Sequence, residues 1–217
     1  MILDKSPLET DALSPTLAKI LLAAEAEFAQ RGFDGAGMKA ISMRAEVSQA
    51  LLHYHFGTKD RLYSEVIAQR SKKINEERHM LLNALDLRSG TVLEGIFDAL
   101  FRPPLGPAGG DKSYARIFSG LVVGRERDQI LVKQHYDPTA QAFVRALQSA
   151  LGAPDRAVAA QSYTFALGAL IAVIGRDGRI ERLMGNDDQR LETEDILLQL
   201  ITFCKGGVLA LAAAQTT

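Results

Sequence analysis

The chain of 217 residues lacks several features that would point to particular classes of protein. Its only cysteine, Cys204, cannot form an intrachain disulfide and has no second thiol with which to build a structural zinc site. There is no tryptophan, and the net charge of −1 argues against a protein that binds polyanions through its total charge. A lone thiol suits a reducing compartment, so we expect a cytoplasmic protein.

Recognisable catalytic motifs are missing as well. The chain has no G-x-S-x-G elbow, no phosphate-binding glycine loop and no metalloprotease helix. His53 and His55 stand two residues apart, so they would point in different directions on a helix, which disfavours a metal site. Cys204 lies in an apolar segment, where an inert buried thiol is the usual state. We therefore expect no enzyme, no metal and no cofactor.

Signals for export or membrane insertion are also weak. Residues 1–13 show no basic region followed by an apolar run, so no signal peptide is expected, and they are predicted to be a short, loosely held arm. The apolar segment 155–174 is interrupted by polar residues from Gln161 to Thr164, which leaves a clean run of about ten residues, short of the roughly 18 to 20 that a membrane span needs. We expect a buried helix there and no membrane partner.

The apolar residues that are present recur mainly at helical spacing, and no strand pairs or internal repeats stand out, so the predicted fold class is all-α. Ser14-Pro15 should begin the first helix and Gly32 should end it. A long helix should follow from 59 to 85, with its middle, 70–78, mostly solvated. A helix is predicted at 91–101, opened by a Thr91-x-x-Glu94 capping box and ended by Pro103-Pro104. Further helices are predicted at 112–123, 155–174 and 193–213. In the apolar segment 130–151, Asp137-Pro138 either kinks one helix or caps a second.

The segment 38–59 has the spacing of two short helices joined by a tight turn. Ile41 lies on the buried face of the first, and Ser48 is well suited to cap the second. Leu52 and Phe56, four residues apart, should face inward, which leaves an outward set of Gln, Ala, Tyr and His. Such a helix suits the major groove of DNA. A buried helical hairpin is the alternative, but it leaves three consecutive polar aromatic residues, His53 to His55, without a role.

These residues resemble the TetR-type transcriptional repressors, through the pattern Phe28…Gly32-Phe33…Ile41-Ser42…Ala45…Val47-Ser48…Leu52-His53-Tyr54-His55-Phe56-Gly57-Thr58-Lys59-Asp60…Leu62. The resemblance implies a three-helix, helix-turn-helix DNA-binding domain with its arm at 1–60. It also implies a larger helical domain at 61–217 for regulation, ligand binding and dimerisation. In that family the last two long helices usually pair with their copies as a four-helix dimer interface.

Three positions depart from the pattern of the family. Gly37 stands where a Ser or Thr N-cap is frequent, so the first short helix loses a side-chain acceptor. Glu46 replaces a frequent turn glycine, which is costly if that position requires a positive φ. His53 replaces a common phosphate-contacting Tyr, which would make that contact sensitive to pH. None of these changes removes a core anchor.

The resemblance also implies contacts with DNA. Gln49, Ala50 and Leu51 would meet base edges, whereas the backbone contacts would come from Lys39, Ser48, His53, Tyr54, His55 and Lys59. The surrounding segment, 15–73, carries nine Lys and Arg against six Asp and Glu, an excess of positive charge that fits a DNA-facing surface. The partner would be double-stranded DNA with an approximately palindromic operator, bound by a homodimer.

The rest of the chain has enough aromatic surface to line a ligand pocket, although the same residues could simply fill a core. The candidates are Phe97, Phe101, Tyr114, Phe118, Val122, Tyr136, Phe143 and Phe165, with Arg116, His135 and Gln161 as polar anchors. The stretch 91–170 is loosely similar to the fatty-acid-responsive repressors of the PsrA type. The predicted function is thus a sequence-specific transcriptional repressor released by a small hydrophobic effector, a fatty acid or acyl derivative. The alternative is a helical scaffold with a degenerate DNA-binding head.

Overall fold

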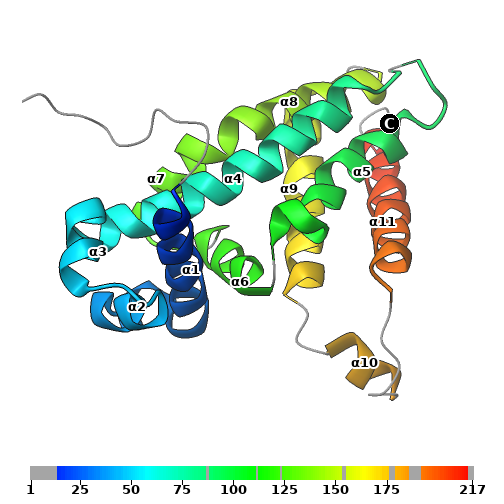
Figure 1. Ribbon diagram of the computed structural model, residues 1–217. Coiled ribbons are helices and arrows are strands. Elements are labelled where there is room, and N and C mark those ends of the chain that lie inside the picture. Colours follow the sequence, from blue (N-terminus) through cyan, green and yellow to red (C-terminus); the bar gives the residue numbers. More distant parts are fainter. Residues whose placement is uncertain are drawn as a thin grey trace, which may run out of the picture. The chain divides into compact units, whose positions relative to one another are not determined.

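A computed structural model describes residues 14–86, 88–110, 112–122, 124–152, 155–175, 179–185 and 192–214. The elements are α1 (Pro15–Gly35), α2 (Met38–Arg44), α3 (Gln49–Phe56), α4 (Lys59–Asn83), α5 (Val92–Leu105), the 3-10 turn η1 (Pro107–Gly109), α6 (Lys112–Val122), α7 (Glu126–His135), α8 (Asp137–Ala150), α9 (Arg156–Ile174), α10 (Arg179–Met184) and α11 (Thr193–Ala213) (Figure 1). The described residues contain no strand, and the all-α prediction is confirmed. The arm expected at 1–13 lies outside the described residues.

The chain forms two compact units, one up to Val66 and one from Ile67 onward. Helix α4 begins in the first unit and continues without a break into the second. The domain boundary expected between residues 60 and 61 stays a prediction.

Helix α1 begins as its sequence predicts, whereas the predicted end at Gly32 is a kink within it. The Leu17 N–H donates to the hydroxyl of the N-cap Ser14 (3.3 Å), and Pro15 occupies the first turn, where its missing N–H costs nothing. Gly32 adopts a φ of 67° and breaks the helical conformation, after which one further turn reaches Gly35. The inward face, with Ile20, Ala24 and Phe28, is buried, and α2 packs against α1 and in turn against α3.

Helices α2 and α3 present the inward faces that the spacing indicates. Ile41 and Leu52 are completely buried, and Phe56 is 6% exposed. The Leu51 N–H donates to the hydroxyl of Ser48 (3.1 Å), which confirms the N-cap, whereas the N-cap Gly37 offers no side-chain acceptor to α2. Together with α1 these helices form the predicted three-helix head.

Two expectations for α5 are wrong. Thr91 makes no side-chain cap, because its hydroxyl pairs with that of Ser89, and the carboxylate of Glu94 instead accepts from Lys205 of α11. The helix also does not end at Phe101: it continues through both prolines to Leu105. A proline in a helix removes the bond to the carbonyl four residues earlier, so this continuation depends on donors from outside the helix.

The remaining helices differ from prediction in smaller ways. The sequence left open whether Asp137-Pro138 bends one helix or begins another, and the structure has two helices, α7 and α8. The short helix α10 was not predicted. In the segment 70–78, expected to be mostly solvated, Lys72, Lys73 and Glu76 are exposed, but one stripe of Ser71, Ile74 and Arg78 is buried.

Helices α9 and α11 are long and apolar enough to cross a membrane by length and composition. Each has only about a third of its apolar stretch buried within the chain. They pack against each other, and α11 also packs on α5 (Figure 1). Arg102 of α5 donates to Glu194 of α11 and to Asp98 of its own helix, both at 2.8 Å. Large apolar side chains remain exposed on both helices: Phe165 (61%), Leu198 (55%), Phe203 (74%) and Leu209 (45%).

The turn between α2 and α3 contains a strained residue. Glu46 has a φ of 55° and is the one non-glycine residue with a positive φ in the part of the chain that the structure describes. The left-handed conformation costs a residue with a side chain about 1–2 kcal/mol. Glycine avoids this cost, but its more flexible unfolded chain offsets part of the gain.

We therefore expect Glu46→Gly to stabilise the protein by about 0.5–1 kcal/mol, measured by chemical denaturation. The exposed ion pair between Lys19 and Glu46 (3.8 Å) is lost in this variant but contributes little. Glu46→Ala is the control, since it removes the same side chain and keeps the strain. Equal stabilities for the glycine and alanine variants would contradict the strain at this turn.

Candidate nucleic-acid interface

The outward face of α3 is polar and open to solvent. Gln49, Ala50 and His53 are exposed, and Tyr54 is 83% exposed. Leu51 and His55 are half-buried on the flanks. The predicted base-reading and phosphate-contacting residues of α3 are thus brought together on one short helix, with Ser48 exposed at its N-terminus.

The opposite face of α3 fixes its position. An isolated helix of eight residues is not stable in water, so α3 depends on packing. Leu52 and Phe56 supply that packing, and the Gly57 N–H closes the C-terminus by donating to the His53 carbonyl (2.8 Å). Gly57 has a φ of 67°, which a side chain would disfavour. The outward side chains therefore project from a rigid support.

His53 has a defined orientation despite its exposure. Its Nδ1 lies 2.9 Å from the carbonyl oxygen of Gly57. Because a carbonyl only accepts, Nδ1 must carry the hydrogen of this bond, and Nε2 is left as the other ring nitrogen. Nε2 can donate to a phosphate only when the ring is protonated.

Lys59, expected at a phosphate, makes two bonds within the head. Its ammonium donates to the carbonyls of Asp34 (3.3 Å) and Ala36 (3.0 Å), and it lies 4.5 Å from the centre of the Phe33 ring. An ammonium has three N–H donors, so these bonds leave one for a phosphate. The arrangement also joins the start of α4 to the end of α1.

Arg44 supports the head in a way that sequence reasoning missed. Its guanidinium donates to the buried carboxylate of Glu27 (3.0 Å) and to Gln30 (3.2 Å), which joins α2 to α1. Arg31 pairs with the same carboxylate from α1 itself (3.2 Å). The sequence could have indicated this pair, because Glu27 is an acidic residue at an inward position of α1 that needs a cationic partner. Lys39, a predicted phosphate contact, is exposed on α2.

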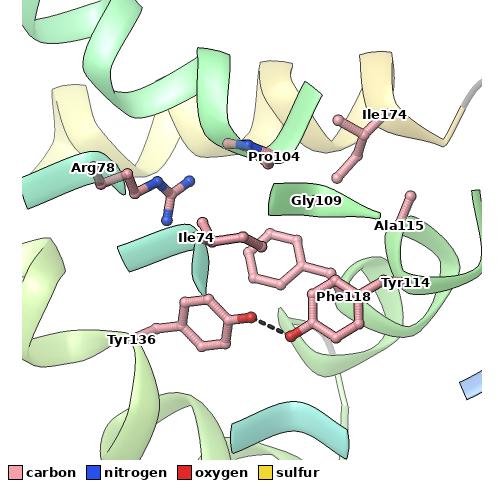
Figure 2. Close-up of a pocket in the computed structure, with 9 residues that line it drawn as sticks. All are labelled: Ile74, Arg78, Pro104, Gly109, Tyr114, Ala115, Phe118, Tyr136 and Ile174. Carbon is pink, nitrogen blue, oxygen red and sulfur yellow. Dashed lines mark hydrogen bonds between the residues drawn. The ribbon is translucent and has the colours of Figure 1, made fainter. Parts of the chain in front are cut away.

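A second candidate site is a small cavity within the second unit. Its lining includes three of the predicted pocket residues, Tyr114, Phe118 and Tyr136. The hydroxyls of Tyr114 and Tyr136 are hydrogen-bonded to each other, and burial raises the pKa of Tyr136, so this hydroxyl stays protonated (Figure 2). Sequence reasoning missed Arg78, which also lines the cavity. The sequence does hint at its burial, because Arg78 lies four residues after Ile74 and therefore shares the apolar face of α4.

The other predicted pocket residues lie elsewhere. Phe97, Phe101 and Phe143 are completely buried in the core, Val122 is half-buried, and Phe165 is on the exposed face of α9. None of these five is part of the cavity lining. The proposed polar anchors Arg116 and Gln161 are exposed, and His135 is half-buried.

The described residues offer little for other chemistry. No group of three or more His, Cys, Asp or Glu side chains in this part of the chain is placed to hold a metal ion. Burial raises the pKa of the Cys204 thiol to about 11, so the thiol stays protonated and unreactive near neutral pH.

A three-helix head that presents a polar helix from an apolar support defines the class of helix-turn-helix DNA-binding proteins. Residues 20–66 match the family described as bacterial regulatory proteins, tetR family, and residues 94–207 match the tetracyclin repressor-like C-terminal domain. The HTH-type transcriptional regulator UidR of Escherichia coli (strain K12) is 36% identical over 66 residues. That match covers 30% of this chain and about a third of the relative.

Solved structures share the fold over most of the chain. A TetR-like transcriptional regulator from Rhodococcus sp. RHA1 has a TM-score of 0.66 at 20% identity, covering 91% of this chain and 98% of that one. The fatty acid degradation regulator FadR from Bacillus halodurans has a TM-score of 0.67 at 13% identity, covering 90% and 97%. FadR from Bacillus subtilis, solved in complex with stearoyl-CoA, has a TM-score of 0.63 at 13% identity, covering 86% and 96%.

The C-terminal match alone covers more than half of the chain, so this protein belongs to the TetR family of transcriptional regulators. Members of this family bind DNA and often small-molecule effectors, and they are not enzymes. The prediction of the family from the segment 38–59 is confirmed.

Removal of the Lys59 ammonium distinguishes its two roles. We expect Lys59→Ala to weaken binding to all DNA sequences and to reduce the slope of log affinity against log salt by about one unit, since each phosphate contact contributes about 0.9. Fluorescence anisotropy at several salt concentrations measures this slope. A less stable variant with an unchanged slope would restrict Lys59 to joining α1 and α4.

Proposed function

We propose that the protein is a cytoplasmic, homodimeric repressor that binds an approximately palindromic operator and is released by a small hydrophobic effector, such as a fatty acid or acyl derivative. The observation that carries DNA binding is the outward set of Gln49, Ala50, His53 and Tyr54, exposed on a helix whose other face is completely packed. Solvent-exposed aromatic and amide groups on a rigid helix serve no packing role, and they suit base edges and phosphates.

Within this proposal the contacts divide into two sets. Gln49, Ala50 and Leu51 meet base edges from the N-terminal turn of α3, where Leu51 can contact a thymine methyl group. Lys39, Ser48, His53, Tyr54, His55 and Lys59 contact the DNA backbone, which sets affinity and register.

The effector proposal is supported by the second unit and by its relatives. An apolar cavity lies within it, and two solved structures with the same fold are described as fatty acid regulators or contain stearoyl-CoA. Helix α4 carries residues of both the head and the cavity lining, so a change around the cavity has a covalent route to the head. An effector releases DNA only to the extent that it binds the DNA-incompetent state more tightly.

The function is tested by a gel-shift titration on the DNA that flanks the gene of this protein. We expect a specific complex that survives competitor DNA, and Gln49→Ala should change the preference at particular base pairs. Lys72→Ala, on the exposed side of α4, is the control and should keep the wild-type preference. Absence of any specific complex would favour the helical scaffold with a degenerate head.

The dimer proposal rests on the exposed apolar face of α9 and α11. Phe203 is 74% exposed, and next to it Gly206 and Gly207 have open space around them, which allows a second chain to approach closely. Exposed apolar area of this kind usually marks a protein interface. A dimer would place two copies of α3 about 34–36 Å apart, one turn of DNA.

We expect Phe203→Glu to halve the molar mass measured by light scattering and to weaken operator binding, because it buries a charge in the interface. Met80→Glu is the control, since Met80 is also a largely exposed apolar residue (64%) but lies on α4. A dimeric Phe203→Glu protein, or a monomeric Met80→Glu protein, would place the interface elsewhere.

A further inference from the structure

Arg78 of α4 is a charged side chain in the interior of the second unit. It is 2% exposed, and burial is the main cause that lowers the pKa of its guanidinium. Taking such a charge out of water is costly unless an opposite charge compensates it. Among the described residues no carboxylate pairs with Arg78, and the ionisable groups that act on it are the hydroxyls of Tyr114, Tyr136 and Tyr163.

One of its N–H groups has a structural task. The Arg78 Nε–H donates to the carbonyl of Leu100 (3.1 Å). In an uninterrupted helix that carbonyl would accept from residue 104, but residue 104 is a proline and has no N–H. Arg78 thus supplies the missing donor and explains why α5 continues past its prolines.

This task does not require a charge. It uses one of the five N–H donors of a guanidinium, and a neutral amide could supply one donor as well. The four donors on the two terminal nitrogens have no hydrogen-bond partner among the described residues. Arg78 therefore carries a positive charge and a set of paired donors beyond what the fold uses.

The guanidinium lies at the wall of the cavity (Figure 2). The rest of the lining is mainly apolar and comes from α4, α5, η1, α6, α9 and the junction of α7 and α8: Ile74, Pro104, Gly109, Tyr114, Ala115, Phe118, Tyr136 and Ile174. A single cation in an apolar wall is complementary to a molecule with one anionic head and an apolar body. The fork of a guanidinium matches the two oxygens of a carboxylate.

The cavity is small. Its volume of about 10 Å³ is close to the space that one water molecule needs. A larger molecule must therefore displace side chains of the lining, so its binding selects a more open form of the second unit. A unit that must rearrange on binding can couple occupancy of the cavity to its DNA-binding state.

We propose that Arg78 binds the carboxylate of an amphipathic monocarboxylic acid, whose apolar body enters the cavity beside Phe118 and Ile174. The inference deepens the proposed function by naming the anchor and the chemistry of the effector. It favours a free acid over an acyl thioester, because the carboxylate that Arg78 recognises is consumed when a thioester forms.

The test uses the full chain without DNA, so that its outcome is independent of operator binding. Isothermal titration calorimetry compares decanoate with decanol, which has the same chain length and no charge, and with decanoyl-CoA. We expect decanoate to bind at least about 10-fold more tightly than either, since a charge-assisted pair in a buried site is worth that factor or more. Arg78→Met should reduce this preference for decanoate over decanol to about one.

A matched control and a stability measurement separate binding from folding. Lys73→Met removes the same charge from an exposed position of α4 and should keep the preference. Arg78→Met removes both the buried charge and the donor to the Leu100 carbonyl, so each protein is compared with itself with and without ligand. Decanoate should raise the melting temperature of the wild type and leave that of Arg78→Met unchanged. If Arg78→Met does not fold, the wild-type comparison of the three probes still decides.

Equal affinities of decanoate and decanol for the wild type, tighter binding of decanoyl-CoA, or a preference that survives Arg78→Met would each overturn the proposal. So would the absence of binding by all three probes. Failure of the gel shift with intact decanoate binding would instead reject the proposed repressor and leave the carboxylate site in place.

Discussion

Burial of Leu52 and Phe56 is the constraint on which the DNA-binding head depends. Helix α3 has eight residues, too few to persist in water, and these two side chains are the part of it that packs in the core. Because residues on a helix cannot rotate independently, fixing this face also fixes the direction of Gln49, Ala50, His53 and Tyr54. The packing that stabilises α3 is therefore the same packing that orients its outward side chains.

The second unit depends on a buried polar interaction, the hydrogen bond from Arg78 to the Leu100 carbonyl. Pro103 and Pro104 deprive α5 of two N–H donors, and Arg78 restores one of the lost bonds from a neighbouring helix. The cost is a buried cation beside an apolar cavity. A neutral amide side chain could donate this hydrogen bond as well. The positive charge of Arg78 is therefore not explained by the fold and indicates a ligand.

Local patterns in the sequence predicted most of the helices and the inward and outward faces of the head. Ser14 and Ser48 are caps because the donors that they satisfy lie three residues away, within the reach of local reasoning. The predictions that failed depend on distant residues. Glu94 leaves its capping box because Lys205 pairs with it, and α5 passes Pro104 because Arg78 donates to Leu100.

The lining of the cavity could also be predicted only in part from the sequence. Tyr114, Phe118 and Tyr136 were predicted from their aromatic character, but so were Phe97 and Phe143, which fill the core instead. Composition cannot separate a pocket wall from a core, since both are apolar, and it assigns an arginine such as Arg78 to the surface. The short helix α10 was missed because its described side chains are all exposed, which leaves no buried stripe to detect.

Coupling between the cavity and the head is the central claim, and one linked pair of titrations tests it. Fluorescence anisotropy measures the affinity for operator DNA as decanoate is added, and calorimetry measures the affinity for decanoate with and without operator. Thermodynamic linkage requires both factors to be equal. We predict that decanoate weakens DNA binding, by about 5-fold or more, and that the operator weakens decanoate binding by the same factor. Tight decanoate binding that leaves DNA affinity unchanged would contradict an effector role for the cavity.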